Sequence, residues 1–499
     1  MRGNVKSTSL VSVAVATTAA LLAYGLIVLA EVSATRQVLL PAILLTLLAV
    51  LIIAIRSYQR STGTWEPLFH PRVGPLAYMC YALLVPPLYM AVTGSGIGSI
   101  SHATLTAPTV AVMILTVAVY VLGTFAGDLS SRGKHVVTGR IVVKPLPSTS
   151  GGTSVWTRLL MFGRVVLLLA LAAKLYQLRT SGSVFTGVYG ADQTSFSTAT
   201  SIAVIGESLV AVGALMIMLA NTQLGVDPLR KLDLLLLVSV LFVAVLLLGS
   251  RGEALAPLIL YVWFRAAVGK RIRRAWLLAG TAGLGLFLVL VWQLRTSAQL
   301  TAEYPPVQQL LWQTSSPQLL TATVTGLVPA SADFYQGSTY LNALKYFAPG
   351  PVSRALFGEP EATGALAYRD LIQFTDPNQG FGFALPTEAY LNFGFAGVVT
   401  IAFLLGYLFQ VSYRRAIAHE QGHTVSMVLY PLLVSYLPYG LRTDFLGQSK
   451  SIIYPLIIIL LCYLIARGEP ARERSPMGNA ARPETTRNLS PVAQRHESI

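Results

Sequence analysis

Charged residues and cysteines are both scarce in this chain of 499 residues. Asp, Glu, Lys and Arg together make up 11% of it, whereas a soluble globular domain carries about 25%. So low a share excludes an ordinary soluble protein. The two cysteines, Cys80 and Cys462, both fall within apolar stretches, which excludes a framework of disulfide bonds.

Motifs for nucleotide chemistry are also absent. No P-loop pattern and no Asp-x-Asp motif occurs anywhere in the chain. The stretch from Gly94 to Gly98 is rich in glycine, but no strand–helix unit surrounds it, so it is not a dinucleotide fingerprint. The sequence gives no indication of ATP or of a nucleotide-linked donor, and we expect no cofactor.

One stretch matches a metal-binding pattern. His419-Glu-Gln-Gly-His423 has the His-Glu-x-x-His spacing of zinc proteases. Gly422 weakens the helix that the two histidines would need, and a catalytic zinc site requires a third protein ligand. No such ligand follows on the same predicted side of the membrane before Glu469. We therefore expect no metal site.

Apolar residues are abundant and occur in long runs. Hydrophobic residues make up 54% of the chain, and the mean hydropathy is +0.62. The runs are too long and continuous for barrel strands, so they predict an all-α, polytopic membrane bundle. Hydropathy predicts about twelve spans, near residues 10–30, 38–55, 74–93, 105–126, 160–178, 199–220, 234–249, 254–268, 275–293, 393–412, 424–440 and 451–466.

The basic residues predict the orientation of these spans. When the loops are assigned alternately to the two sides, most Lys and Arg fall on the side of the N-terminus, which predicts that both termini are cytoplasmic. We attribute the net charge of +15 to topology and anionic lipid, and expect no nucleic-acid partner. The run 10–30 lacks a clean cleavage site, so we interpret it as a retained span rather than a signal peptide.

Three regions follow from this topology. Residues 1–466 form the transmembrane domain, and residues 467–499 form a polar cytoplasmic tail that we expect to be disordered. Residues 294–392 form a large outer loop between the ninth and tenth spans. Because this loop is long and contains apolar patches, we expect it to fold against the bundle as short helices on the membrane surface.

Arg251 is the first candidate for chemistry. It lies in the turn Gly249-Ser-Arg-Gly-Glu253 between two apolar runs, at the predicted outer surface. Arg179, Arg295 and Arg442 also lie at the outer ends of predicted spans. A guanidinium pairs with phosphate oxygens through two hydrogen bonds, so four at one depth fit a lipid-linked diphosphate. The alternative is that each extends to the interface from a helix end.

Carboxylates on the same predicted side supply a candidate base. Glu388 precedes the tenth span, where it could accept a proton from a sugar hydroxyl; the alternative is an acid that stabilises the first turn of a helix. Glu253 and Asp444 are candidate substrate-binding residues. For Asp444, an ion pair with Arg442 is the alternative.

Two motifs carry a resemblance to a known family. The Gly-Ser-Arg-Gly-Glu turn, the large outer loop and the string from Pro386 to Gly397 together resemble the Wzy-type O-antigen polymerases, also called oligosaccharide repeat unit polymerases. The arrangement covers residues from about 160 to 466. Within the string, Glu-x-Tyr-x-Asn-Phe-Gly-x-x-Gly is the more specific motif.

The resemblance implies a metal-independent, inverting glycosyltransferase with a GT-C-like fold. Such an enzyme joins oligosaccharides linked to polyprenyl diphosphate, such as undecaprenyl diphosphate, on the extracellular or periplasmic face of the plasma membrane. It implies Arg251 as the outer arginine and Glu388, Tyr390 and Asn392 as the motif residues, while Arg295 and Arg442 correspond by location alone. Membrane lipids, a flippase and a chain-length regulator are the partners that it suggests.

Two other functions remain open from the sequence. A flippase or other polysaccharide transporter would place charges along a path through the middle of the membrane, whereas in this chain they gather at the outer rim. An O-antigen ligase has a similar architecture, but typically needs a histidine in the outer loop, and residues 294–392 contain none.

Overall fold

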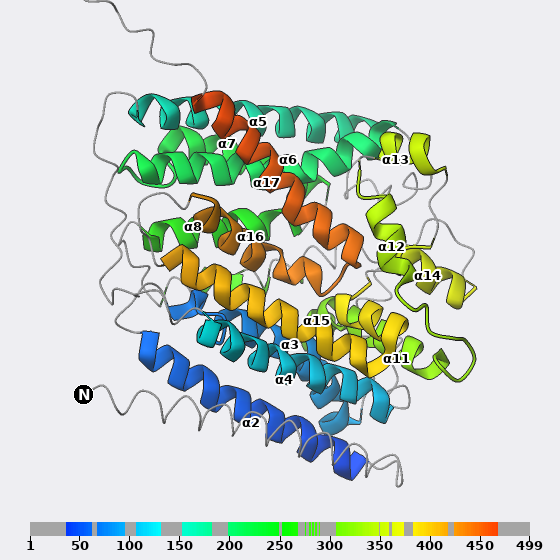
Figure 1. Cartoon of the computed structure of the whole chain (residues 1–499). Helices are drawn as coiled ribbons and strands as arrows, with labels where there is room; N and C mark the ends of the chain where they lie inside the picture. Colours follow the sequence, from blue (N-terminus) through cyan, green and yellow to red (C-terminus); the bar gives the residue numbers. More distant parts are fainter. Residues whose placement is uncertain are drawn as a thin grey trace, which may run out of the picture.

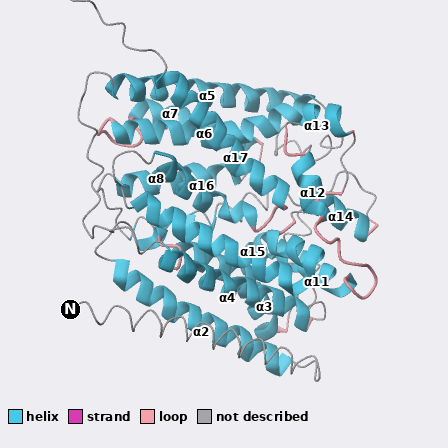
Figure 2. Cartoon of the chain, viewed as in Figure 1, coloured by secondary structure: helices cyan, strands magenta, loops and turns pink. Residues whose placement is uncertain are grey.

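The computed structural model describes an all-helical chain, with no strand among the residues that it describes (Figure 2). Those residues are 36–61, 67–94, 106–130, 152–181, 198–248, 252–267, 306–348, 350–358, 362–373, 383–417 and 424–467, with a few isolated positions between 275 and 289. The predicted all-α class is confirmed for this part of the chain.

The helices follow one another along the chain with short turns between many of them (Figure 1). They are α2 (Arg36–Ser61), the 3-10 turn η1 (Pro67–Phe69), α3 (Gly74–Thr93), α4 (Ala107–Ser130), α5 (Gly152–Ser181), α6 (Thr198–Gln223), α7 (Lys231–Leu241) with the π-helical turn η4 (Phe242–Leu247), α8 (Gly252–Ala267), α11 (Pro306–Leu327), α12 (Ser338–Lys345), α13 (Gly350–Phe357), α14 (Gly364–Leu371), α15 (Leu385–Ile417), α16 (Thr424–Gly440) and α17 (Phe445–Arg467).

Six of the described helices are long and apolar enough to cross a membrane, namely α2, α3, α4, α5, α15 and α17. Shorter apolar stretches lie in α6, α8 and α16. The predicted span at 10–30 lies outside the described residues, as does most of the one at 275–293; every other predicted span coincides with a described helix. The chain is thus a multi-pass helical membrane protein.

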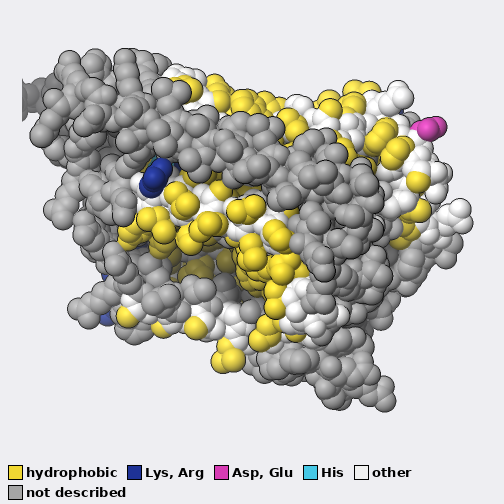
Figure 3. Space-filling view, turned by 90° about the horizontal axis from the view of Figure 1, so that it is seen from below, with side chains coloured by type: hydrophobic (Ala, Val, Ile, Leu, Met, Phe, Trp, Pro, Cys, Tyr) yellow, Lys and Arg dark blue, Asp and Glu magenta, His cyan; other side chains and the backbone are white. Residues whose placement is uncertain are grey.

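The outer surface of the bundle is apolar where it is described. Leu48 on α2, Leu235 on α7 and Leu461 on α17 are each more than half exposed. Figure 3 shows a face on which the described side chains are mostly hydrophobic, with few charges. Such a surface is costly in water and favourable in a lipid bilayer, so it supports the membrane assignment.

Glycines bring α4 and α15 into close contact at the centre of the bundle. A Cβ atom on Gly123 would lie 2.1 Å from the carbonyl oxygen of Phe403, and one on Gly406 would lie 2.0 Å from that of Tyr120. Gly127 completes a small-x-x-x-small pattern on α4, the arrangement that lets membrane helices approach closely. This contact fixes α15, which carries the candidate base.

The predicted outer loop contains both short and long helices. Helices α12, α13 and α14 have eight residues each and gather at one end of the bundle (Figure 1). Helix α11 differs from the short surface helices that we expected, because it has 22 residues and packs against α3 and α4. Its contacts include a hydrogen bond of 3.1 Å from Gln308 Nε2 to Tyr89 Oη and one of 2.9 Å between the hydroxyls of Thr325 and Thr109.

A break in α15 joins the loop to the bundle. Phe393 and Gly394 depart from helical geometry, and Gly394 has a φ of 61° and a ψ of −147°, which favours glycine. The break frees the carbonyl groups of Leu391 and Asn392, which accept hydrogen bonds from the N–H groups of Tyr335 and Gln336 at 3.1 and 3.0 Å. The loop before α12 is thereby held against the first turns of α15.

Candidate active site

Glu388 lies in the first turn of α15, and its side chain is fully buried. Its Oε2 accepts a hydrogen bond of 2.6 Å from the backbone N–H of Phe445, and its Oε1 accepts one of 2.8 Å from the Thr339 hydroxyl. The two donors belong to α17 and α12. The carboxylate therefore joins three helices that are far apart in the sequence.

The amino end of α17 provides a favourable place for negative charge. Asp444 caps this helix, because its Oδ1 accepts the N–H of Gly447 at 2.9 Å, while its Oδ2 accepts the N–H of Ala365 on α14 at 3.3 Å. Glu388 binds the N–H of Phe445 in the same turn. Unpaired N–H groups and the helix dipole both stabilise anions at such an end. Two carboxylates thus meet at one helix terminus.

Asn392 completes a chain of hydrogen bonds that orients Glu388. Its Nδ2 donates to the hydroxyl oxygen of Thr339 at 2.7 Å and to the carbonyl oxygen of Glu388 at 2.8 Å. Its Oδ1 accepts the N–H of Gly337 at 3.0 Å. Because the Thr339 oxygen accepts from Asn392, its single proton is directed to Glu388. The structure therefore brings together three residues predicted for the site, namely Glu388, Asn392 and Asp444.

Tyr390 lies on the opposite face of the same turn. Its hydroxyl donates to the carbonyl oxygen of Val328 at 3.3 Å, and its ring packs edge to face against Phe334 and Phe395. A step of two residues turns an α-helix by about 200°, so Tyr390 is buried in an apolar cluster away from Glu388. The structure does not bring this member of the motif to the carboxylates.

The part of the chain that the structure describes does not bring the predicted arginines together at Glu388. Arg442 is exposed in the turn before Asp444, and Arg179 is exposed in the last turn of α5. Arg251 and Arg295 lie outside the described residues, as does the side chain of Glu253 at the start of α8. A shared diphosphate site for these residues stays a prediction.

Sequence reasoning missed Thr339 and Gly364, which contact the carboxylate of Glu388. Thr339 follows Gly337-Ser338, a possible start of a helix, but nothing local indicates that it faces α15. Gly364 is covered by the carboxylate so closely that a Cβ atom there would lie 2.6 Å from Glu388 Cδ and 2.9 Å from Asp444 Cβ. Both contacts join segments distant in sequence, and hence only a structure reveals them.

We expect Gly364→Ala to disturb this site directly. The added methyl group would overlap the Glu388 carboxylate, which has hydrogen bonds on both oxygens and little room to shift. Overpacking of this kind costs about 1–3 kcal/mol. A fall in the thermal midpoint of the purified variant, together with reduced polymer synthesis, would agree with this expectation. Gly358→Ala is not a suitable control because Gly358 has a φ of 80°, whereas Gly326→Ala is, since its Cβ would meet open space.

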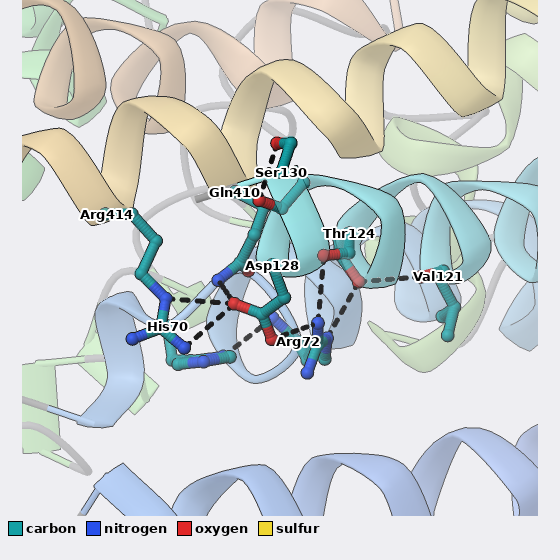
Figure 4. Close-up of polar contacts among 9 residues, drawn as sticks. His70, Arg72, Val121, Thr124, Asp128, Ser130, Gln410 and Arg414 are labelled. Atoms are coloured by element: carbon teal, nitrogen blue, oxygen red, sulfur yellow. Dashed lines mark hydrogen bonds and ion pairs between the residues drawn. The ribbon is translucent and has the colours of Figure 1, made fainter. Parts of the chain in front are cut away.

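A second polar cluster lies at the other end of α15 (Figure 4). Asp128 on α4 accepts hydrogen bonds from Arg72 at 2.6 Å, from Gln410 at 2.6 Å and from Arg414 at 2.9 Å. Arg72 also donates to the hydroxyl and carbonyl oxygens of Thr124 and lies 3.8 Å from the centre of the Phe125 ring. These partners engage Nε and one terminal nitrogen of Arg72, so we interpret the cluster as structural.

A neutral histidine lies beside this cluster. Burial, with the charge of Arg72 next, lowers the pKa of His70 to about 3. Its Nδ1 accepts the backbone N–H of Arg72 at 3.2 Å, and its ring packs edge to face on Tyr413. His70 therefore adds no positive charge beside the two arginines at neutral pH.

Among the described residues, no group of three or more His, Cys, Asp or Glu side chains is arranged to hold a metal ion. The His419–His423 stretch lies outside the described residues.

Comparison with known proteins decides the family. The family model of the O-antigen polysaccharide polymerase Wzy matches residues 99–468. The chain belongs to this family. The match covers every described helix from α4 to α17, and with them both carboxylates of the candidate site. No curated protein and no solved structure matches the chain.

Membership in the family establishes the general activity, which is polymerisation of O-antigen repeat units. It also establishes a lipid-linked oligosaccharide as the class of substrate and the membrane as the place of action.

Proposed function

We propose that this polymerase joins repeat units linked to polyprenyl diphosphate on the outer face of the plasma membrane, by inverting transfer without a metal ion. The hydroxyl oxygen of the acceptor sugar attacks the anomeric carbon of the growing chain. The bond between that carbon and the diphosphate oxygen breaks, and the diphosphate leaves with the electron pair. One glycosidic bond forms and the lipid diphosphate of the growing chain is released.

The observation that carries this proposal is the fixed carboxylate of Glu388, which we propose as the general base. Its two hydrogen bonds occupy one lone pair on each oxygen and hold the group in one orientation. A second lone pair on each oxygen stays available for the proton of the acceptor hydroxyl. A base held in this way needs no reorganisation when the proton is transferred.

Access to Glu388 requires a movement of the loop helices. The side chain is fully buried, and Gly364 at the start of α14 covers its carboxylate. An acceptor hydroxyl therefore reaches Glu388 only after α14 has moved away from α15 and α17. The hydrogen bond from Ala365 N–H on α14 to Asp444, the residue before α17, is long at 3.3 Å and would break in this movement.

We propose the four arginines that the sequence predicts at the outer ends of spans as ligands for the leaving diphosphate, with Arg251 in the main role. Arg179, Arg295 and Arg442 are further ligands in this proposal, and Glu253 and Asn392 complete the candidate set, whereas Tyr390 packs on the opposite face of α15. A fork of N–H donors stabilises the charge that develops on the diphosphate as the bond breaks. A flippase that supplies the substrate and a regulator of chain length are proposed partners.

Reconstitution of the purified protein tests the function. The substrate is the lipid-linked repeat unit extracted from a strain that lacks the gene, and the reaction contains a metal chelator and no nucleotide. We expect a ladder of products that differ by one repeat unit. Single repeats moved across vesicle membranes without a ladder would indicate a transporter, and loss of the ladder on chelation would contradict the metal-independent mechanism.

A further inference from the structure

Tyr340 lies beside the candidate base and takes no part in holding it. It follows Thr339 on α12, and its ring stacks on Phe393 at 6.3 Å with an angle of 20° between the planes. The same ring meets Phe445 edge to face at 5.2 Å. Phe393 marks the break in α15 and Phe445 begins α17, so Tyr340 contacts both segments that surround Glu388.

The hydroxyl of Tyr340 is buried and has no hydrogen-bond partner among the described residues. Two buried tyrosines elsewhere in the chain do have a partner for their hydroxyl. Tyr120 donates to the carbonyl oxygen of Pro71 at 3.1 Å, and Tyr390 donates to that of Val328 at 3.3 Å. A buried hydroxyl without a partner destabilises a fold, whereas phenylalanine would provide the same ring without this cost.

The hydroxyl is also a donor at neutral pH. Burial, with the charge of Glu388 next, raises the pKa of Tyr340 above its usual value. The phenol therefore keeps its proton and can donate one hydrogen bond while accepting another. Tyr340 and Glu388 both contact Phe445, which places the tyrosine beside the carboxylate.

We infer that Tyr340 binds the acceptor sugar, donating a hydrogen bond to one of its oxygens while Glu388 contacts the attacking hydroxyl. The inference rests on the proposed function and names a further residue of the same site. A pyranose sugar suits a site with both polar groups and aromatic rings, because it carries hydroxyl groups around its edge and C–H groups on its faces. Phe393, which is 49% exposed, offers an aromatic face beside the phenol to those C–H groups.

Tyr340→Phe separates this role from a structural one. Removing an unpartnered hydroxyl should leave the thermal midpoint unchanged or raise it. Loss of one hydrogen bond to the acceptor should raise the concentration of lipid-linked repeat unit needed for half-maximal extension by about threefold to tenfold. Purified enzyme is assayed for both quantities, with the product ladder read over a series of substrate concentrations.

Tyr120→Phe is the matched control. Its hydroxyl is also buried but donates to the carbonyl oxygen of Pro71, in the turn before α3 and away from the candidate site. We expect this variant to have a lower thermal midpoint and normal dependence on substrate concentration, the reverse of the Tyr340 result. Extension by Tyr340→Phe with wild-type concentration dependence would overturn the inference, and so would a fall in its thermal midpoint without a change in that dependence.

The activity of Glu388→Gln, measured beside that of Tyr340→Phe, tells a failure of this inference from a failure of the proposed function. If Glu388→Gln is inactive while Tyr340→Phe behaves as wild type, the base proposal stands and the role of Tyr340 is wrong. If Glu388→Gln extends chains normally, the proposed base itself is wrong, whatever the Tyr340 variant does.

Discussion

Glu388→Gln should abolish chain extension while leaving the protein folded. The amide has the size and shape of the carboxylate, so its oxygen can still accept the N–H of Phe445 and its nitrogen can face the Thr339 oxygen. What it loses is the ability to accept a proton. General base catalysis contributes about 10²–10⁴-fold to a rate, so we expect the yield of polymer to fall by at least about a hundredfold. Sizing of the products made by equal amounts of purified wild type and variant measures this effect.

Asp370→Asn provides the matched control for this loss. Asp370 is an exposed acid on α14, the helix whose first residue covers Glu388. The same change from carboxylate to amide should leave extension at the wild-type level. Near-normal polymer from Glu388→Gln at wild-type abundance would show that the carboxylate only joins the loop to α15 and α17.

Hydropathy predicted the positions of the helices well because each apolar run carries its own signal. The predicted spans at 74–93 and 424–440 have the same bounds as α3 and α16. Helix α11 was not predicted as a long helix, since its sequence is rich in Gln, Ser and Thr. Of these polar residues, Gln309, Thr321 and Thr325 are buried, and the helix packs against α3, α4 and α15. Burial of polar side chains against other helices depends on tertiary packing, which the average hydropathy of a local window cannot detect.

The candidate site was predictable only in part, for a related reason. Glu388 and Asn392 are four residues apart, so they share a helix face and the structure brings them together. The same periodicity places Tyr390 on the opposite face of the helix. The sequence motif groups Tyr390 with Glu388 and does not show this separation. Thr339 and Gly364 contact Glu388 from two other helices, and no local pattern specifies which part of the loop packs there.

The second polar cluster, around Asp128, also could not be predicted from the sequence. Arg72 lies between the predicted spans 38–55 and 74–93, where nothing in the local sequence indicates that it is buried. In the structure it is 5% exposed and paired with Asp128. With a rise of 1.5 Å per residue, the 22 residues from Glu388 to Gln410 span roughly 33 Å, about the thickness of the hydrocarbon core of a bilayer. The two ends of α15 therefore hold buried carboxylates a membrane thickness apart.

Asp128→Ala should cause a large loss of stability. The substitution leaves Arg72 buried without a counter-ion and removes the acceptor of Gln410 and Arg414 as well. Removing one partner of a buried ion pair costs about 3–5 kcal/mol. Because α4 and α15 are joined by this cluster at one end and by glycine contacts along their length, we expect their packing to loosen and protein abundance to fall. The free energy of unfolding, measured by titrating the purified protein with SDS in mixed micelles, reports the loss.

Two further variants test whether the loss of stability comes from leaving Arg72 buried without a counter-ion, and not merely from removing an acidic side chain. Asp227 pairs with Arg265 at 3.7 Å, and both side chains are about a third exposed, so Asp227→Ala should cost less than about 1 kcal/mol. The double variant Arg72→Met/Asp128→Leu removes both charges of the buried pair and keeps apolar volume, and it should be more stable than Asp128→Ala alone. Arg414, whose side chain is 31% exposed, can turn toward water when its acceptor is gone. An Asp128→Ala protein as stable as Asp227→Ala would show that α4 and α15 are held by their glycine contacts without help from the cluster.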